Sequence, residues 1–353
     1  MLKTTNELIE HLKLDEQLRD YRVIESLVYA ILKCGDKSDA DSILLHYLQD
    51  PFEYSQLVPV IKKFGDYQYA EQIFDVCIQK NILNEKTIPD LEILEDYRFP
   101  NILEVLAYLK FTPIKQLLAN LAFVSGSGLE SLGIYPYEVT STAALGLLNF
   151  DCEEYQDSIE TEIEKCYGQN LFLEFVPALV CKLKNKSQVL EKLYDLGKNY
   201  ASSDCNAGII LGFSLCGEEG RKYFKEVLFD NSWGAYDGGT GTLSSTYNGM
   251  KNLGITIREL YHEIKQLSDK AQLNDSLYGL FRLLECRIWD YESNDKESFT
   301  DIYTQLYSWE TLTTSNNIVD LARKVDQESE AYKIEQLIEM KMNEEILLKN
   351  FGR

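Results

Sequence analysis

The chain has 353 residues, of which 45% are hydrophobic, and its 57 acidic and 35 basic residues give a formal net charge of −22 at pH 7. Proteins bind nucleic acids and anionic membranes largely through Lys and Arg, so this charge argues against both kinds of partner. We expect either a basic protein partner or, as the simpler alternative, acidity that only keeps the protein soluble.

The cysteines and the lack of long apolar stretches indicate the cellular compartment. No cysteines have the spacing of a zinc site or a disulfide framework, so we expect free thiols in helix cores and a reducing environment. The cysteines are Cys34, Cys77, Cys152, Cys166, Cys181, Cys205, Cys216 and Cys286. No stretch is apolar enough to span a membrane, and the first residues have no signal-peptide pattern. We therefore predict a cytoplasmic protein without a membrane partner.

Along the chain, the first strong pattern is a segment that occurs twice, thirty positions apart. Residues 28–36 (VYAILKCGD) and 58–66 (VPVIKKFGD) are apolar runs that end in Gly-Asp, and a second apolar run follows each. Apolar residues recur at helical spacing and the glycines stop the first helices. Asp36 and Ser38 lie where the second helix needs a cap, and Gly65-Asp66 repeats this arrangement. We predict helices at about 21–34, 38–49, 54–64, 67–80 and 86–95.

Looser copies of this pattern follow at residues 106–113, 145–151, 211–218 and 321–326. A repeated helix–turn–helix unit cannot bury its apolar face alone, so it stacks against its neighbours. The pattern resembles HEAT repeats, most clearly over residues 21–80. A tetratricopeptide array is the near alternative, although its Trp, Gly and Pro positions are missing. The resemblance implies an all-α fold, an α-solenoid of stacked antiparallel helical hairpins that becomes irregular in the second half.

Two stretches interrupt the helical pattern. Residues 125–136 contain three Gly, three Ser and one Pro and form the expected boundary between two halves, and residues 231–249 form the longest predicted non-helical insertion. We predict four parts: N-terminal helical repeats at 1–124, central helical repeats at 137–230, the Gly-rich loop at 231–249, and C-terminal repeats with a capping helix at 250–353.

The 231–249 loop is the first candidate site. Its glycines, threonines and serines offer backbone N–H groups that could bind an anion, but no Gly-Lys-Ser/Thr sequence or preceding strand supports a nucleotide site. Long loops often contact partners, and Trp233, Tyr236 and Asp237 are the residues expected to do so here. A plain connection without function is the alternative.

An acidic segment is the second candidate site. Residues 151–164 contain seven carboxylates, and a helix beginning near residue 153 would place four of them on one face: Glu153, Asp157, Glu160 and Glu164. Like charges at this spacing repel one another, so a cationic protein could dock there. Carboxylates that are simply solvated are the alternative, and calcium is disfavoured because the Asp-x-Asp-x-Asp-Gly loop is absent.

No residue pattern predicts catalysis, a metal or a cofactor. The three histidines, His11, His46 and His262, lack a second ligand at helical spacing, and no Gly-x-Ser-x-Gly nucleophile motif is present. His262 lies next to Glu263 and one turn from Glu259, so an acid–base role is the alternative to a helix-surface residue. We predict no catalytic residue and no cofactor.

These patterns favour a non-enzymatic protein-binding scaffold, for example an immunity or inhibitor protein that masks a basic toxin or nuclease. An enzyme or small-molecule-binding protein, with a site in the helical groove near the 231–249 loop, is the first alternative. A HEAT-like DNA glycosylase is the second, because that fold hosts one. It would need a basic concave face, to which a local patch such as Lys182, Lys184 and Lys186 could contribute.

Overall fold

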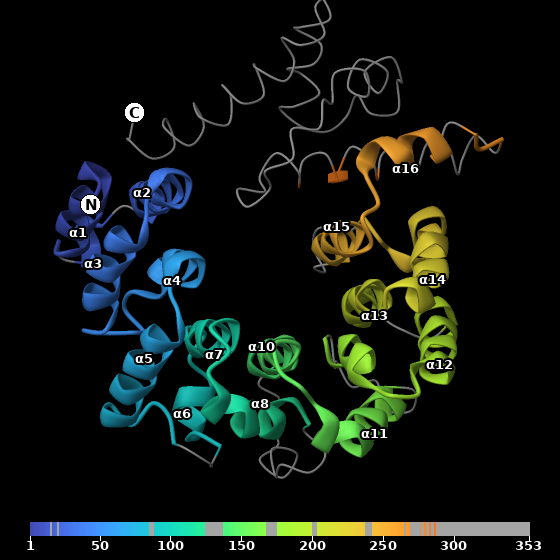
Figure 1. Ribbon diagram of the computed structural model, residues 1–353, viewed down its shortest axis with the longest axis horizontal. Helices are drawn as coiled ribbons and strands as arrows, with labels where there is room; N and C mark the ends of the chain where they lie inside the picture. Colours follow the sequence, from blue (N-terminus) through green and yellow to red (C-terminus); the bar gives the residue numbers. More distant parts are fainter. Residues whose placement is uncertain are drawn as a thin grey trace, which may run out of the picture. The chain divides into compact units, whose positions relative to one another are not determined.

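The computed structural model describes residues 1–14, 16–19, 21–84, 88–123, 137–166, 175–199, 203–236, 242–264 and 266–268, and residues 276, 279, 282, 283 and 286. Within these residues all regular secondary structure is helical and no strand is present, which confirms the all-α prediction (Figure 1). The chain divides into two compact units, Met1–Leu196 and Gly197–Arg353. The predicted C-terminal helix and the 321–326 repeat lie outside the described residues.

The first unit contains most of the helices. They are α1 (Lys3–Leu12), α2 (Tyr21–Cys34), α3 (Lys37–Tyr47), α4 (Val58–Phe64), α5 (Tyr67–Gln79), α6 (Leu91–Leu94), α7 (Phe99–Tyr108), α8 (Lys115–Ala122), α10 (Tyr137–Leu147), α11 (Gln156–Cys166) and α12 (Lys186–Asn199), the last of which continues into the second unit. Short 3-10 turns connect them: η1 (Glu16–Leu18), η2 (Ser55–Leu57), η3 (Thr112–Ile114), η5 (Glu153–Tyr155) and η6 (Val176–Lys182).

The two copies of the sequence repeat form the same turn. Asp36 and Asp66 have nearly equal backbone angles, φ −138° and ψ −171° against φ −140° and ψ −172°, and each carboxylate accepts from the N–H groups two and three residues further on. A Cβ atom on Gly35 or Gly65 would lie 2.6 or 2.4 Å from a carbonyl oxygen of the preceding helix. The glycine is therefore required because the chain passes close to the last turn of the first helix. The aspartate is required because its carboxylate binds N–H groups at the start of the second helix.

Helices of the first unit pack against elements that are close in sequence. In one layer α2 packs on α4, α4 on α7, and α7 on α10 (Figure 1). Two further helices flank this layer: α3 packs on α4, and α5 packs on α7. Both α7 and α8 contact α10, so the helices on either side of the predicted break at 125–136 belong to one unit. Residues 124–136 lie outside the described residues, and the predicted four-part division stays a prediction.

One predicted helix is much shorter than expected. Of the described residues 88–95, only Leu91–Leu94 form a helical turn, α6, and residues 88–90 are not helical; residues 86 and 87 lie outside the described residues. Pro89 explains the difference, because the residue before a proline is disfavoured in helical conformation and the proline ring itself cannot donate a helix hydrogen bond.

The second unit contains α13 (Ser203–Leu215), α14 (Glu218–Phe229), η7 (Asn231–Trp233), α15 (Thr242–Leu253) and α16 (Ile257–Ile264). Here α13 packs against α14 and, more extensively, against α15. The prediction of a non-helical insertion at 231–249 is wrong for its second half, because α15 begins at Thr242. The face of α15 that is buried includes Thr242, Ser245, Thr246 and Gly249. These small and hydroxylated residues conceal the helical period in the sequence.

Candidate functional site: the acidic segment 151–164

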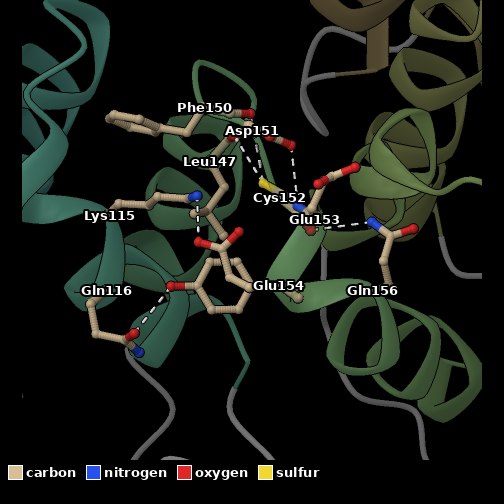
Figure 2. A network of polar contacts seen from close by, with 10 residues as sticks. Lys115, Gln116, Leu147, Phe150, Asp151, Cys152, Glu153, Glu154 and Gln156 are labelled. Carbon is tan, nitrogen blue, oxygen red and sulfur yellow. Dashed lines mark hydrogen bonds and ion pairs between the residues drawn. The ribbon is translucent and has the colours of Figure 1, made fainter.

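The acidic segment begins with a tight turn after α10. The Asp151 carboxylate accepts from the Glu153 N–H at 3.1 Å, and the buried Cys152 thiol donates to the carbonyls of Leu147 and Phe150 at 3.5 and 3.7 Å (Figure 2). Burial raises the pKa of the Cys152 thiol, so it stays protonated and can donate. The turn thus fixes where the following carboxylates emerge.

Contacts to α8 hold one side of this turn. Lys115 Nζ lies 2.5 Å from Glu154 Oε1, and the Tyr155 hydroxyl donates to Gln116 Oε1 at 3.1 Å (Figure 2). The hydrogen bond from Lys115 lowers the pKa of the Glu154 carboxyl. Glu154 is therefore engaged within the protein, although it belongs to the acidic run.

Gln156 holds the other side of the turn. Its side-chain amide donates to the carbonyl of Cys152 at 3.1 Å and to that of Lys182 at 2.9 Å, while its oxygen accepts from the Lys184 N–H at 2.9 Å. One side chain thereby connects the start of α11 to the end of η6. Sequence reasoning missed Gln156, because a single glutamine among carboxylates has no distinctive spacing.

The four carboxylates of the predicted stripe have different surroundings. Glu153 belongs to η5 rather than to α11 and lies 3.2 Å from Lys184, whereas Glu164 lies 2.9 Å from Lys192. Asp157 and Glu160 are exposed on α11, and none of the described cations forms an ion pair with either. All four carboxylates are thus exposed, but they do not form a uniform stripe: Glu153 and Glu164 pair with exposed lysines of this chain, and Asp157 and Glu160 pair with no described cation.

A recurring arrangement accounts for many of the described cations. A Lys or Arg forms an ion pair with a carboxylate and lies over a tyrosine ring further along the chain: Lys62 Nζ is 2.6 Å from Glu104 and 4.8 Å from the Tyr108 ring centroid. The other examples are Arg19 with Glu53 and Tyr54, Lys37 with Asp66 and Tyr69, and Lys115 with Glu154 and Tyr155. Such pairs join neighbouring elements, and they leave part of the acidic excess facing solvent.

Two residues of the first candidate site, the 231–249 loop, have partners inside the protein. Trp233 is completely buried, its ring lies 5.9 Å from that of Phe213, and a Cβ atom on Gly197 would approach it to 2.1 Å. Tyr236 is half-buried; its hydroxyl donates to the Leu228 carbonyl at 2.6 Å, and its ring lies against Gly279. The prediction that Trp233 contacts a partner is therefore corrected, since it packs inside the second unit, and Tyr236 stays a predicted contact. Asp237 lies outside the described residues.

The acid–base alternative at His262 depends on its two acidic neighbours, Glu259 and Glu263. Glu263 forms an ion pair with Lys225 at 2.9 Å, and the Glu259 carboxylate accepts from the Thr256 N–H at 2.9 Å, so both neighbours of His262 have structural roles. No three His, Cys, Asp or Glu side chains in the described ranges are placed to hold a metal ion. Among the described helices, none combines the length and hydropathy needed to cross a bilayer.

Comparisons with protein-family models, with curated proteins and with solved structures gave no match to this chain. The function of the chain is therefore inferred from the geometry of the described residues.

Proposed function

We propose that this chain is a non-enzymatic scaffold that binds a basic protein, and that the exposed side of α11 forms part of the contact. The observation that carries the proposal is the difference between the paired and the unpaired carboxylates. All four carboxylates are exposed; Glu153 and Glu164 each have a lysine partner within the chain, whereas no described cation pairs with Asp157 or Glu160. Like charges one helical turn apart repel each other, and a cation from a partner would relieve that repulsion.

The finer description of the fold belongs to the same proposal. We infer a HEAT-like solenoid from the matching Gly-Asp turns at Asp36 and Asp66 and from the series of contacts between α2, α4, α7 and α10. Stacked helical hairpins present an extended surface, which suits recognition of another protein. A cytoplasmic location remains part of the proposal.

One specific form of the proposal is an immunity or inhibitor protein. Carboxylates at a fixed spacing can occupy the basic groove with which a toxin or nuclease binds its substrate, because they present negative charges to the same lysines and arginines. The net charge of −22 would also accelerate the encounter with such a partner.

The two alternative functions have less support. A small-molecule site near residues 231–249 could not use Trp233, which is completely buried, and the Tyr236 hydroxyl already donates to the Leu228 carbonyl. A DNA glycosylase would need free lysines, but Lys184 lies 3.2 Å from Glu153.

Affinity capture from the cytosol of the source cell, with three baits, tests the proposal. The baits are the wild type, Asp157→Asn/Glu160→Gln, and Glu71→Gln/Asp75→Asn; the last removes two exposed carboxylates of α5 and gives the same change in net charge. We expect the wild type and the α5 variant to retain the same stoichiometric basic protein, and the α11 variant to retain several-fold less. Equal recovery with all three baits, or no stoichiometric protein with the wild type, would contradict the proposal.

A further inference from the structure

His46 lies in the last turn of α3, and its imidazole is buried in the first unit. Only 6% of the residue is exposed, and its ring centroid lies 4.4 Å from that of Tyr54. The Nε2 atom has no hydrogen-bond partner among the described residues. An imidazole in such a place differs from the usual buried polar group, which is hydrogen-bonded.

The charged groups around His46 would oppose its protonation. Lys13, at the end of α1, and Arg19, just after η1, are the cations whose charges act on it. Arg19 is held in place, because it donates to the Leu14 carbonyl at 2.8 Å, forms an ion pair with Glu53 and lies over the Tyr54 ring. A proton on His46 would add a positive charge beside two existing ones.

The described carboxylates of the surrounding elements have other partners. Glu10 lies 2.6 Å from Lys13, Glu53 pairs with Arg19, and the Asp50 carboxylate accepts from the N–H groups of Phe52 and Glu53 at 3.0 and 3.2 Å. The side chains of Asp15, Glu16 and Asp20 lie outside the described residues. As far as the described carboxylates are concerned, a protonated His46 would therefore have to leave its site or draw one of them away from an existing pair.

Burial lowers the pKa of His46, and the charges of Lys13 and Arg19 lower it further. In the unfolded chain a histidine has a pKa of about 6.5. Because the folded-state pKa is the lower of the two, the unfolded state binds the proton first as the pH falls. The stability contributed by neutral His46 is thus complete above about pH 6.5 and is lost as the pH decreases toward the folded-state pKa.

We propose that His46 is a pH-sensitive switch: when neutral it allows α1 and η1 to pack beside α3 and Tyr54, and when protonated its charge repels Lys13 and Arg19 and releases them. α1 packs on α3 and contributes the buried side chains of Leu8 and Leu12 to the core. Release of α1 uncovers these side chains next to Leu14 and Leu18, which are already exposed. Acidification therefore exposes an apolar surface at this end of the first unit.

A titration of the wild-type protein by NMR tests the proposal directly. The chain has three histidines, and His11→Gln and His262→Gln identify the two other imidazole signals. We expect His46 to be less protonated at pH 6 than a free histidine, which is mostly protonated there. At lower pH we expect the amide protection of α1 to decrease together with protonation of His46. Protonation of His46 at the pH of a free histidine, or without any loss of protection in α1, would overturn the proposal.

A substitution gives an independent measurement. His46→Phe keeps an aromatic ring beside Tyr54 and removes the titrating nitrogen, and His262→Gln serves as the control because His262 is exposed. In the wild type and the control, the unfolding equilibrium constant should rise by up to about tenfold per pH unit below about pH 6.5, beyond the rise in His46→Phe. Equal pH dependence in all three proteins would overturn the proposal. The NMR titration decides the question even if His46→Phe does not fold.

Discussion

The segments 151–164 and 231–236 both stand out in the sequence, yet they have opposite places in the structure. Asp157 and Glu160 are exposed on α11, whereas Trp233 is completely buried. Charge is a useful guide to exposure, because burying an unpaired carboxylate is costly: of the seven carboxylates in 151–164, only Glu162 is buried. An aromatic residue among glycines is no such guide, because whether Trp or Tyr is buried depends on distant parts of the chain that form its pocket.

The largest expected effect tests the buried side of this comparison. Trp233→Ala should lower the free energy of unfolding of the second unit by about 3–5 kcal/mol, because it leaves a cavity beside Phe213 and Gly197. Urea denaturation followed by circular dichroism measures the effect. Tyr97→Ala, which removes an aromatic residue that is 75% exposed, is the control and should change stability by less than about 0.5 kcal/mol. Similar costs for the two variants would mean that Trp233 is not a core residue.

A smaller effect distinguishes neighbouring residues within the acidic segment. Gln156→Ala should lower the free energy of unfolding by about 1–3 kcal/mol, because the Lys184 N–H and the Lys182 carbonyl lose their partner. Asp157→Asn, one position further along, should have almost no effect on the same denaturation curve. If both changes had the same cost, the segment would not have the anchored and free sides described above.

Asp66 tests whether an acidic residue can be structural while partly exposed. Asp66→Ala should lower the free energy of unfolding by about 1 kcal/mol, because the carboxylate caps α5. The hydrogen bond from Lys37 lowers the pKa of Asp66 in the folded protein, so this contribution is present above about pH 4 and is lost as the pH falls through the folded-state pKa. The difference between wild type and variant should therefore shrink on acidification. A difference that persists at pH 2 would argue against the carboxylate as its source.

The smallest expected effect concerns the exposed carboxylates themselves. Asp157→Asn/Glu160→Gln should raise the free energy of unfolding by a few tenths of a kcal/mol, because it removes a repulsion between neighbouring charges. The gain should decrease in high salt, which screens exposed charges. A clear loss of stability would show that these carboxylates support the fold, and the proposed role in partner binding would lose its basis.

Much of the first unit could be predicted from the sequence. The helices around Asp36 and Asp66 were predictable because hydrocarbon side chains recur at helical spacing and Gly-Asp marks each turn. α15 was not predictable in the same way, since its buried face contains Thr242, Ser245 and Thr246. The Thr246 hydroxyl donates to the Ala235 and Thr242 carbonyls at 2.7 and 2.9 Å, so a polar residue is accommodated in the core only through contacts formed on folding.

The candidate site was predictable in position but not in detail. The carboxylate spacing correctly identified Asp157 and Glu160 as exposed residues of α11. Nothing in the sequence indicated that Lys184 and Lys192 would pair with Glu153 and Glu164, because such pairs form between elements whose distance is set by tertiary packing. For the same reason the slot that Gly197 provides for Trp233 could not be recognised in advance.

The most direct test of the account is the salt dependence of association between this protein and the captured basic partner. Association rates are compared for the wild type and two variants, Asp157→Asn/Glu160→Gln and Glu71→Gln/Asp75→Asn. The two variants have the same change in net charge. The account predicts that the α11 variant associates about three- to tenfold more slowly at low salt and depends less on salt, while the α5 variant behaves like the wild type. Identical salt dependence in the two variants would contradict it, because the total charge and not the exposed face of α11 would then determine binding.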